Sequence, residues 1–174
     1  SRYSGQRELR VGVPIAGRGC AESERLIGFF VNTQVLTARI DGDESFSAFL
    51  ARTREAVLGA QANPDLPFEQ LVDALQPERS LSYNPLFQVA CNHQPSRRDA
   101  LRELPGGLQL ESLELDGGIA KFDLTLNTEE SRDGQVRGQF MYATDQFDAA
   151  TLSRLCGHFL NLLRGIVADP HCPV

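Results

Sequence analysis

The side chains best suited to polar chemistry in this sequence are amides and hydroxyls, not a nucleophile paired with a base. Asn84 stands directly before Pro85, which biases the Asn84 backbone toward an extended conformation and stiffens it. The Asn84 amide can donate one hydrogen bond and accept another. Ser82 lies two residues earlier, and Asn32 and Thr33 form a second polar pair inside an apolar run. These four residues are the candidates for positioning a polar substrate.

Groups that manage protons or hold metal ions do not cluster in the sequence. The three histidines, His93, His158 and His171, stand apart from one another, and no Gly-x-Ser-x-Gly elbow or metal-ligand pair replaces them. The glycines at positions 12, 17 and 19 do not have the spacing of a dinucleotide fingerprint. We therefore expect no catalytic residue, no metal site and no directly bound cofactor in this chain.

Composition predicts one globular domain that binds neither nucleic acid nor membrane. Of the 174 residues, 41% are hydrophobic and 23% charged, as in folded domains with their own core. The formal net charge of −6 disfavours binding to a phosphate backbone. No apolar run approaches the roughly 18 residues of a membrane-spanning helix. The four cysteines lie far apart, so we expect reduced thiols and a cytoplasmic protein.

One stretch, residues 63–89, organises the polar candidates and much of the expected core. Pro67 suits a first helical turn, and Pro77 ends the helix that follows. Residues at helical spacing give this short helix an apolar face: Phe68, Leu71, Val72 and Leu75. After a polar loop, the apolar run from Leu86 to Cys91 is typical of a buried strand. On composition alone, the stretch is a connection from a helix to a strand.

The remaining elements follow from hydrophobic periodicity and capping residues. Strands are expected over 9–15, 29–40, 108–115, 122–126 and 136–142. Ser45 and Asp148 are predicted N-caps of two amphipathic helices, and 22–26 is a predicted helical turn. Segment 29–40 is apolar on both faces, which predicts a central strand, whereas the polar segment 92–107 predicts a loop. This order indicates an α/β (α+β) sandwich, a mixed β-sheet covered by helices.

Six segments of the chain resemble motifs of the condensation domains of nonribosomal peptide synthetases. In family order they are Arg10–Arg18, Ile27–Thr33, Leu66–Glu69, Arg79–Leu86, Lys121–Leu126 and Tyr142–Asp148. The family usually has His-Gln-Asp before its Leu-Pro-Phe-Glu motif, and Asn63-Pro64-Asp65 stands there instead. The likeness runs across nearly the whole chain, but it covers only the C-terminal half of the family's domain.

The resemblance implies that residues 1–174 are the C-terminal subdomain of a condensation domain with a chloramphenicol acetyltransferase-like fold. Such domains form a peptide bond between a donor acyl or peptidyl thioester and an acceptor aminoacyl thioester. Both substrates are carried on phosphopantetheine arms of peptidyl carrier proteins. The family's active-site motif, His-His-x-x-x-Asp-Gly, belongs to the N-terminal subdomain and is absent from this sequence. The expected partners are that subdomain, the carrier proteins and an adjacent adenylation domain.

The same resemblance assigns roles to the polar candidates. It places Asn84 near the reaction centre, on one wall of the substrate tunnel, with Ser82 as a weaker candidate. Asn32 and Thr33 either border the substrate channel or satisfy neighbouring loops, because a buried polar group needs a partner. The isolated lobe is expected to be inactive and to expose an apolar or mixed face, which it can bury by self-association.

Arg79, Glu69 and Pro85 are interpreted as structural residues of the motifs. Arg79 and Glu69 would lock the loop through charge-assisted hydrogen bonds, and Pro85 would fix the backbone that carries Asn84. Three alternative functions stay open at this point. The chain could be a non-catalytic module that docks carrier proteins, or a lobe of an epimerisation or dual condensation-epimerisation domain. A free-standing acyltransferase would need its own catalytic histidine motif, which the sequence lacks.

Overall fold

The computed structural model describes residues 3–19, 21–75, 83–95, 118–131 and 133–174. Nine helices and strands follow one another in these described residues: β1 (Glu8–Ile15), α1 (Ala21–Glu24), β2 (Asn32–Arg39), α2 (Phe46–Gln61), α3 (Phe68–Leu75), β3 (Val89–Pro95), β4 (Leu124–Glu130), β5 (Val136–Tyr142) and α4 (Ala149–Ala168). The strands form one sheet in the order β2-β1-β3-β4-β5. This architecture confirms the predicted mixed sheet covered by helices.

The sheet combines both kinds of strand pairing. β1 pairs antiparallel with β2 and parallel with β3, while β4 pairs parallel with β3 and antiparallel with β5. The last pair is a hairpin, as predicted from the short connection between its strands, and Gly134 turns the hairpin loop with a φ of 77°. Among the described strands, β2 therefore lies at one edge of the sheet and β5 at the other.

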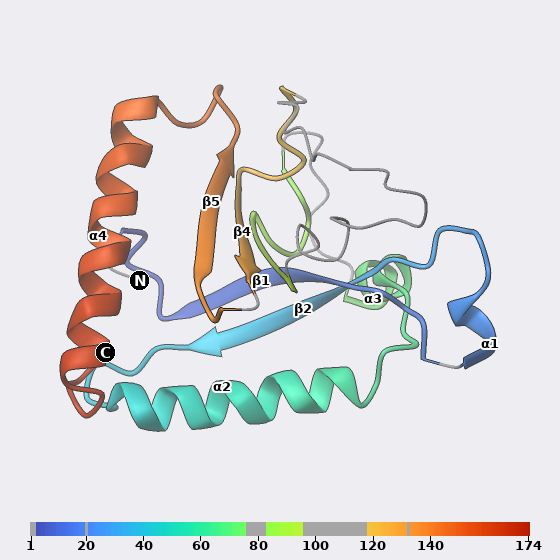
Figure 1. Ribbon diagram of the computed structural model, residues 1–174, viewed down its shortest axis with the longest axis horizontal. Coiled ribbons are helices and arrows are strands. Elements are labelled where there is room, and N and C mark those ends of the chain that lie inside the picture. The colour runs from blue at the N-terminus through green and yellow to red at the C-terminus, as the bar shows by residue number, and fades with distance from the viewer. Residues whose placement is uncertain (1–2, 20, 76–82, 96–117, 132) are drawn as a thin grey trace.

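The prediction that segment 29–40 is a central strand was wrong, because β2 lies at the sheet edge. Its apolar character is explained by two helices that pack on opposite faces of the strand. The Gln34 side chain donates to the Ala60 carbonyl of α2 at 2.5 Å, whereas Val35, on the other face, packs in the core cluster with α3. Figure 1 shows α2 lying along β2. Covering helices, not a second neighbouring strand, leave most residues of β2 half-buried.

Both predicted helix caps are confirmed. The Ser45 hydroxyl accepts a hydrogen bond from the Ala48 N–H at 3.3 Å at the start of α2. The Asp148 carboxylate accepts from the Thr151 N–H at 2.6 Å at the start of α4. That backbone hydrogen bond, assisted by the Thr151 hydroxyl, lowers the pKa of Asp148 below its ordinary value. Each cap satisfies an N–H that has no partner inside its helix.

Helix α4 stands beside β5 (Figure 1) and packs on it through an aromatic pair. The Phe159 and Phe140 ring centroids are 5.7 Å apart in an edge-to-face arrangement. After α4, the chain returns to the start of α2. The Phe46 N–H donates to the Cys172 carbonyl at 3.1 Å, and the Val174 N–H donates to the Glu44 carbonyl at 3.0 Å. The final residues are thus tied to the beginning of another helix.

The core is centred on Phe87, which is 1% exposed. Phe87 contacts the ring of Phe68 on α3 edge-to-face at 5.8 Å and the ring of Phe122 at 5.0 Å. Gly12 of β1 makes room for it, since a Cβ at that position would lie 2.2 Å from the Phe87 ring. The predicted apolar face of α3 is confirmed at Phe68, Leu71 and Val72, which pack on this cluster. Leu75, predicted to share that face, is 59% exposed at the end of the helix.

Both ends of β3 differ from those predicted. β3 begins at Val89, so Leu86 and Phe87 precede the strand although they are buried. The polar residues Asn92–Pro95 continue β3, where a loop was expected. Their pairing with β4 supplies polar partners, since the Asn92 amide donates to the Asn127 amide oxygen at 3.4 Å. The strand predicted over 108–115 lies outside the described residues.

Candidate functional site

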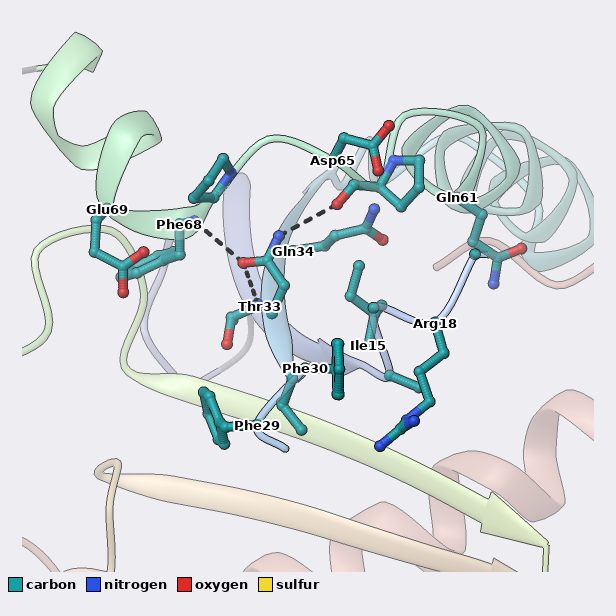
Figure 2. A pocket seen from close by; sticks show the side chains of 17 residues that line it. Ile15, Arg18, Phe29, Phe30, Thr33, Gln34, Gln61, Asp65, Phe68 and Glu69 are labelled. Carbon is teal, nitrogen blue, oxygen red and sulfur yellow. Dashed lines mark hydrogen bonds between the residues drawn. The ribbon is translucent and has the colours of Figure 1, made fainter. Parts of the chain in front are cut away.

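An open groove of about 800 Å³ lies where β1 ends, β2 begins and the α2–α3 connection enters α3. Its walls come from residues 15–19, residues 29–34 and the segment around Gln61–Glu69. Figure 2 shows these segments around the groove, with the Phe29 and Phe30 rings on the wall that precedes β2. Three residues singled out in the sequence line it: Asn32, Thr33 and Glu69.

The Asn32 amide is hydrogen-bonded to the opposite wall of the groove. Its nitrogen donates to the Leu66 carbonyl at 2.8 Å and to the Pro64 carbonyl at 3.3 Å. Its oxygen accepts from the Phe68 N–H at 3.1 Å, and also from the N–H of the next residue at 2.8 Å. Phe68 is the first residue of α3, so Asn32 caps that helix from a distant strand. Of the two interpretations of Asn32, these contacts favour the satisfaction of a neighbouring loop.

The connection between β1 and β2 is held by Arg18, a residue that was not selected from the sequence. The Arg18 guanidinium donates to the Leu26 carbonyl at 3.0 Å and to the Ser23 carbonyl. It also lies over the Phe30 ring, 4.3 Å from the ring centroid. Gly17, just before it, has a φ of +59°, and a Cβ there would lie 2.0 Å from the Phe30 carbonyl oxygen. The feature of the sequence that could have indicated this role is the Gly17-Arg18-Gly19 triplet, in which two glycines flank the arginine.

The groove carries two carboxylates and a threonine hydroxyl as its groups of acid, base or nucleophile type. No histidine, cysteine, serine or lysine is present among its described lining residues. Asp65 and Glu69 bring carboxylates to it, and Arg18 brings the guanidinium (Figure 2). Glu69 lies in the first turn of α3, where the helix dipole stabilises a negative charge. The arrangement can bind and orient polar groups, but it supplies no evident nucleophile–base pair.

Asn84 is not among the residues that line the groove. Its side-chain oxygen accepts from the backbone N–H groups of Leu86 at 3.2 Å and Phe87 at 3.4 Å. Its backbone carbonyl accepts from the Gln88 side chain at 3.0 Å. These bonds shape the turn, with half-buried Pro85 inside it, that delivers Phe87 to the core. A further role of Asn84 at the reaction centre stays a prediction.

Two other predicted site residues, Ser82 and Arg79, lie outside the described residues, so the proposed lock between Arg79 and Glu69 also stays a prediction. Cys91 is half-buried, and burial raises the pKa of its thiol. Within the described residues, no three His, Cys, Asp or Glu side chains are grouped as metal ligands would be. None of the helices in this part of the chain has the length and hydropathy to cross a membrane.

Comparison with known proteins gives a single family. The family profile described as "Condensation domain" matches residues 1–174. The chain is 42% identical over 170 residues to tyrocidine synthase 3 of Brevibacillus parabrevis, covering 98% of this chain and 3% of that protein. It is 42% identical over 174 residues to malpinin synthetase of Mortierella alpina, covering 100% of this chain and 2% of that protein. The chain thus spans a small part of each relative.

Solved structures show the same fold. A four-domain nonribosomal peptide synthetase bound to AMP and glycine superposes with a TM-score of 0.86 at 23% identity, over 97% of this chain and 14% of that one. The first condensation domain of the CDA synthetase superposes with a TM-score of 0.75 at 20% identity, over 99% of this chain and 37% of that one. The predicted chloramphenicol acetyltransferase-like fold is therefore confirmed. With a family profile matched from its first residue to its last, the chain belongs to the condensation domain family of nonribosomal peptide synthetases.

Proposed function

We propose that this chain is the C-terminal lobe of a condensation domain and forms one wall of its substrate tunnel. One observation carries the proposal: the chain matches the family throughout, yet its sequence contains no His-His-x-x-x-Asp-Gly motif. The fold supports it, because the chain covers 37% of a solved condensation domain. The missing motif would come from an N-terminal lobe, so the isolated chain would be inactive.

The reaction is peptide-bond formation between two tethered substrates. The acceptor amine attacks the carbonyl carbon of the donor thioester, the C–N bond forms, the C–S bond breaks, and the donor arm is released as a thiol. A tetrahedral intermediate of this kind needs positioned hydrogen-bond donors and a group that manages the proton. The N-terminal lobe would supply the proton-handling group. This chain would supply polar groups and shape, with Asn84, Ser82, Asn32 and Thr33 as its candidate tunnel residues.

The partners follow from the same assignment. The phosphopantetheine arms belong to donor and acceptor carrier proteins, so the chain itself would bind no cofactor, and an adenylation domain would lie next to it in a cytoplasmic synthetase. An exposed apolar surface supports a further lobe. Large side chains beside the groove are open to solvent, with Phe29 at 88% and Ile27 fully exposed. Such a cluster is typical of a surface that another domain covers.

The test is a condensation assay on the longer polypeptide that carries this chain, with loaded donor and acceptor carrier proteins. Mass spectrometry of the acceptor arm should show the dipeptidyl product, and the isolated chain should give none. Binding of loaded carriers without amide formation would contradict the proposal and indicate a docking module. A product with an inverted donor residue would assign the lobe to the dual condensation-epimerisation type.

A further inference from the structure

We propose that Arg18 is a positioning residue that keeps the β1–β2 connection, residues 16–31, in the shape that one wall of the groove requires. The inference rests on the proposed function, because it gives that wall a role in seating a carrier-bound substrate. Arg18 would act through the backbone and through Phe30, without itself reacting. The connection is long for a link between two adjacent antiparallel strands, so its shape needs support from within.

Three contacts from one side chain provide that support. The Arg18 guanidinium bonds the carbonyl oxygens of Ser23 and Leu26, which belong to the end of α1 and the residues after it. Its central carbon lies over the Phe30 ring, two residues before β2. One half-buried side chain at the start of the connection therefore holds both the middle and the end of it. Arginine suits this task because it combines several donors with a face that stacks on an aromatic ring.

Most of the described side chains in the middle of the connection face solvent. Ser23 is buried, but Arg25, Leu26, Ile27 and Phe29 are exposed. Gly17 brings the backbone against the Phe30 carbonyl so closely that a Cβ would not fit. Without the guanidinium, the segment would lose three of the contacts that balance the entropy of ordering it. We therefore expect the wall to exchange between ordered and open conformations when Arg18 is replaced.

This exchange has a kinetic signature. A substrate that binds only the ordered wall has its apparent affinity reduced by the ordered fraction. The KM for the carrier-bound substrate should rise while kcat is retained, because bound substrate restores the order. A side chain that only stabilised the whole fold would instead lower the active fraction, and with it the apparent kcat, at unchanged KM.

The first experiment measures the connection itself, independently of any reaction. Trypsin can cut after the exposed Arg25, and the cutting rate follows the open population. Mass spectrometry follows cleavage of the Arg25–Leu26 bond, and cleavage after Arg154 serves as the reference. In Arg18→Gln the relative cleavage rate at Arg25 should rise about tenfold, because a cation–π contact and two hydrogen bonds are lost. Arg54→Gln is the matched control, since the Arg54 side chain is 72% exposed and pairs only with its neighbour Glu55 in the described contacts. An unchanged rate in Arg18→Gln overturns the inference.

The digestion is run well below the unfolding transition, as located by circular dichroism. Should Arg18→Gln not fold, Arg18→Lys is the milder variant, because lysine keeps the charge and can bond a carbonyl but loses the planar stack on Phe30. It should shift the cleavage rate in the same direction by a smaller factor. A folded Arg18→Lys protein that is cleaved at the wild-type rate would show that the contact with Phe30 does not support the connection.

The second experiment is the condensation assay of the longer polypeptide at varied concentrations of loaded carrier protein. Arg18→Gln should raise KM by the factor by which the ordered fraction of the wall falls, with kcat within about twofold of wild type, and Arg54→Gln should match wild type. Wild-type enzyme without amide product would show that the proposed function fails. Active wild type together with an unchanged KM in Arg18→Gln would show that the positioning role fails while the proposed function stands.

Discussion

At the scale of single residues, the two asparagines show how one amide can serve the backbone. Asn32 uses its nitrogen and its oxygen to tie β2 to the start of α3, and Asn84 uses its oxygen to shape the turn before β3. Asn32 was selected from the sequence because a buried amide needs partners, and Asn84 because Pro85 stiffens the backbone that carries its amide. Their partners are backbone groups far along the chain or just after the residue. Sequence spacing indicates that such an amide matters, but the identity of its partners depends on the fold.

Asn84 allows the structural role and the tunnel role to be separated. Asn84→Asp keeps an oxygen that accepts from the Leu86 and Phe87 N–H groups, but it removes the amide donor. Asn84→Ala removes both. We expect Asn84→Ala to lose about 1–3 kcal/mol of unfolding free energy, since two N–H groups lose their acceptor. Asn84→Asp should retain most of that stability but lose about tenfold or more in condensation if the amide donates in the tunnel.

Denaturant unfolding and the carrier-protein condensation assay provide the two measurements for these variants. A folded Asn84→Asp enzyme with full turnover would remove Asn84 from the reaction centre and leave it the turn-forming role that its hydrogen bonds already describe. The partners of Arg18 also depend on the fold. Nothing in its sequence neighbourhood except two flanking glycines indicated that it would reach carbonyls five and eight residues away.

At the scale of helices and strands, local signals predicted element type well and sheet position poorly. Ser45 and Asp148 were identified as caps because capping is decided within one turn. The place of β2 in the sheet was predicted wrongly, because its apolar faces are covered by α2 and α3. The hydrophobic pattern of a strand does not show whether helices or other strands cover it. The polar end of β3 was missed for a related reason: Asn92 finds its partner, Asn127, on β4.

The packing of β1 on the core gives a prediction at this scale. Gly12→Ala should destabilise the fold by about 1–3 kcal/mol, because the new methyl group would displace the Phe87 ring. Gly138→Ala in β5 is the matched control, since a Cβ there meets only an ordinary 3.8 Å contact with Leu126. Chemical denaturation of both variants measures the difference. Equal stabilities for the two variants would contradict the account of the core.

The cap of α4 gives a prediction about pH. Because the pKa of Asp148 is lowered in the folded chain, its ionised form is favoured by folding. That contribution is complete above the unfolded pKa of about 3.9 and is lost as pH falls through the lower folded value. Asp148→Ser keeps a neutral cap. Its Tm difference from wild type should be constant above about pH 5 and should shift in favour of the variant under more acid conditions.

Thermal melts of the wild type and Asp148→Ser across this range, read by circular dichroism, measure the shift. Parallel pH curves for the two proteins would mean that the carboxylate contributes nothing beyond what a serine hydroxyl provides. The comparison is made between variants because other carboxylates titrate in the same range, among them Asp133, whose pKa is also lowered, chiefly by the Ser131 hydroxyl.

At the scale of the whole molecule, the described part of the chain has a small interior for its size. Its buried apolar residues are Leu86, Phe87, Ala90 and Leu152, and the exposed large ones include Ile27, Phe29 and Val167. Composition predicted a folded domain with its own core, but it counts apolar residues without showing which of them face solvent. The family motifs predict a lobe that needs a partner, and this stays a prediction.

We expect the isolated chain to self-associate through the apolar cluster beside the groove. Phe29→Asp should lower the association seen by sedimentation velocity without changing the unfolding curve, because an exposed side chain contributes little to the fold. Val167→Asp, on α4 at 83% exposure, is the matched control. A concentration-independent monomer, or dissociation by Val167→Asp alone, would contradict this assignment of the sticky surface.

The backbone hydrogen bonds that join the last residues to the start of α2 have a practical consequence for spectroscopy. Val174 is bonded to Glu44, and Cys172 to Phe46, so a probe on Cys172 would have a well-defined distance to a second probe on α2. In a longer polypeptide, a third label placed further along would then report the motion of whatever follows, free from fraying at the join. The distance between the probes on Cys172 and α2 would serve as a fixed internal reference for measuring the motion of neighbouring domains.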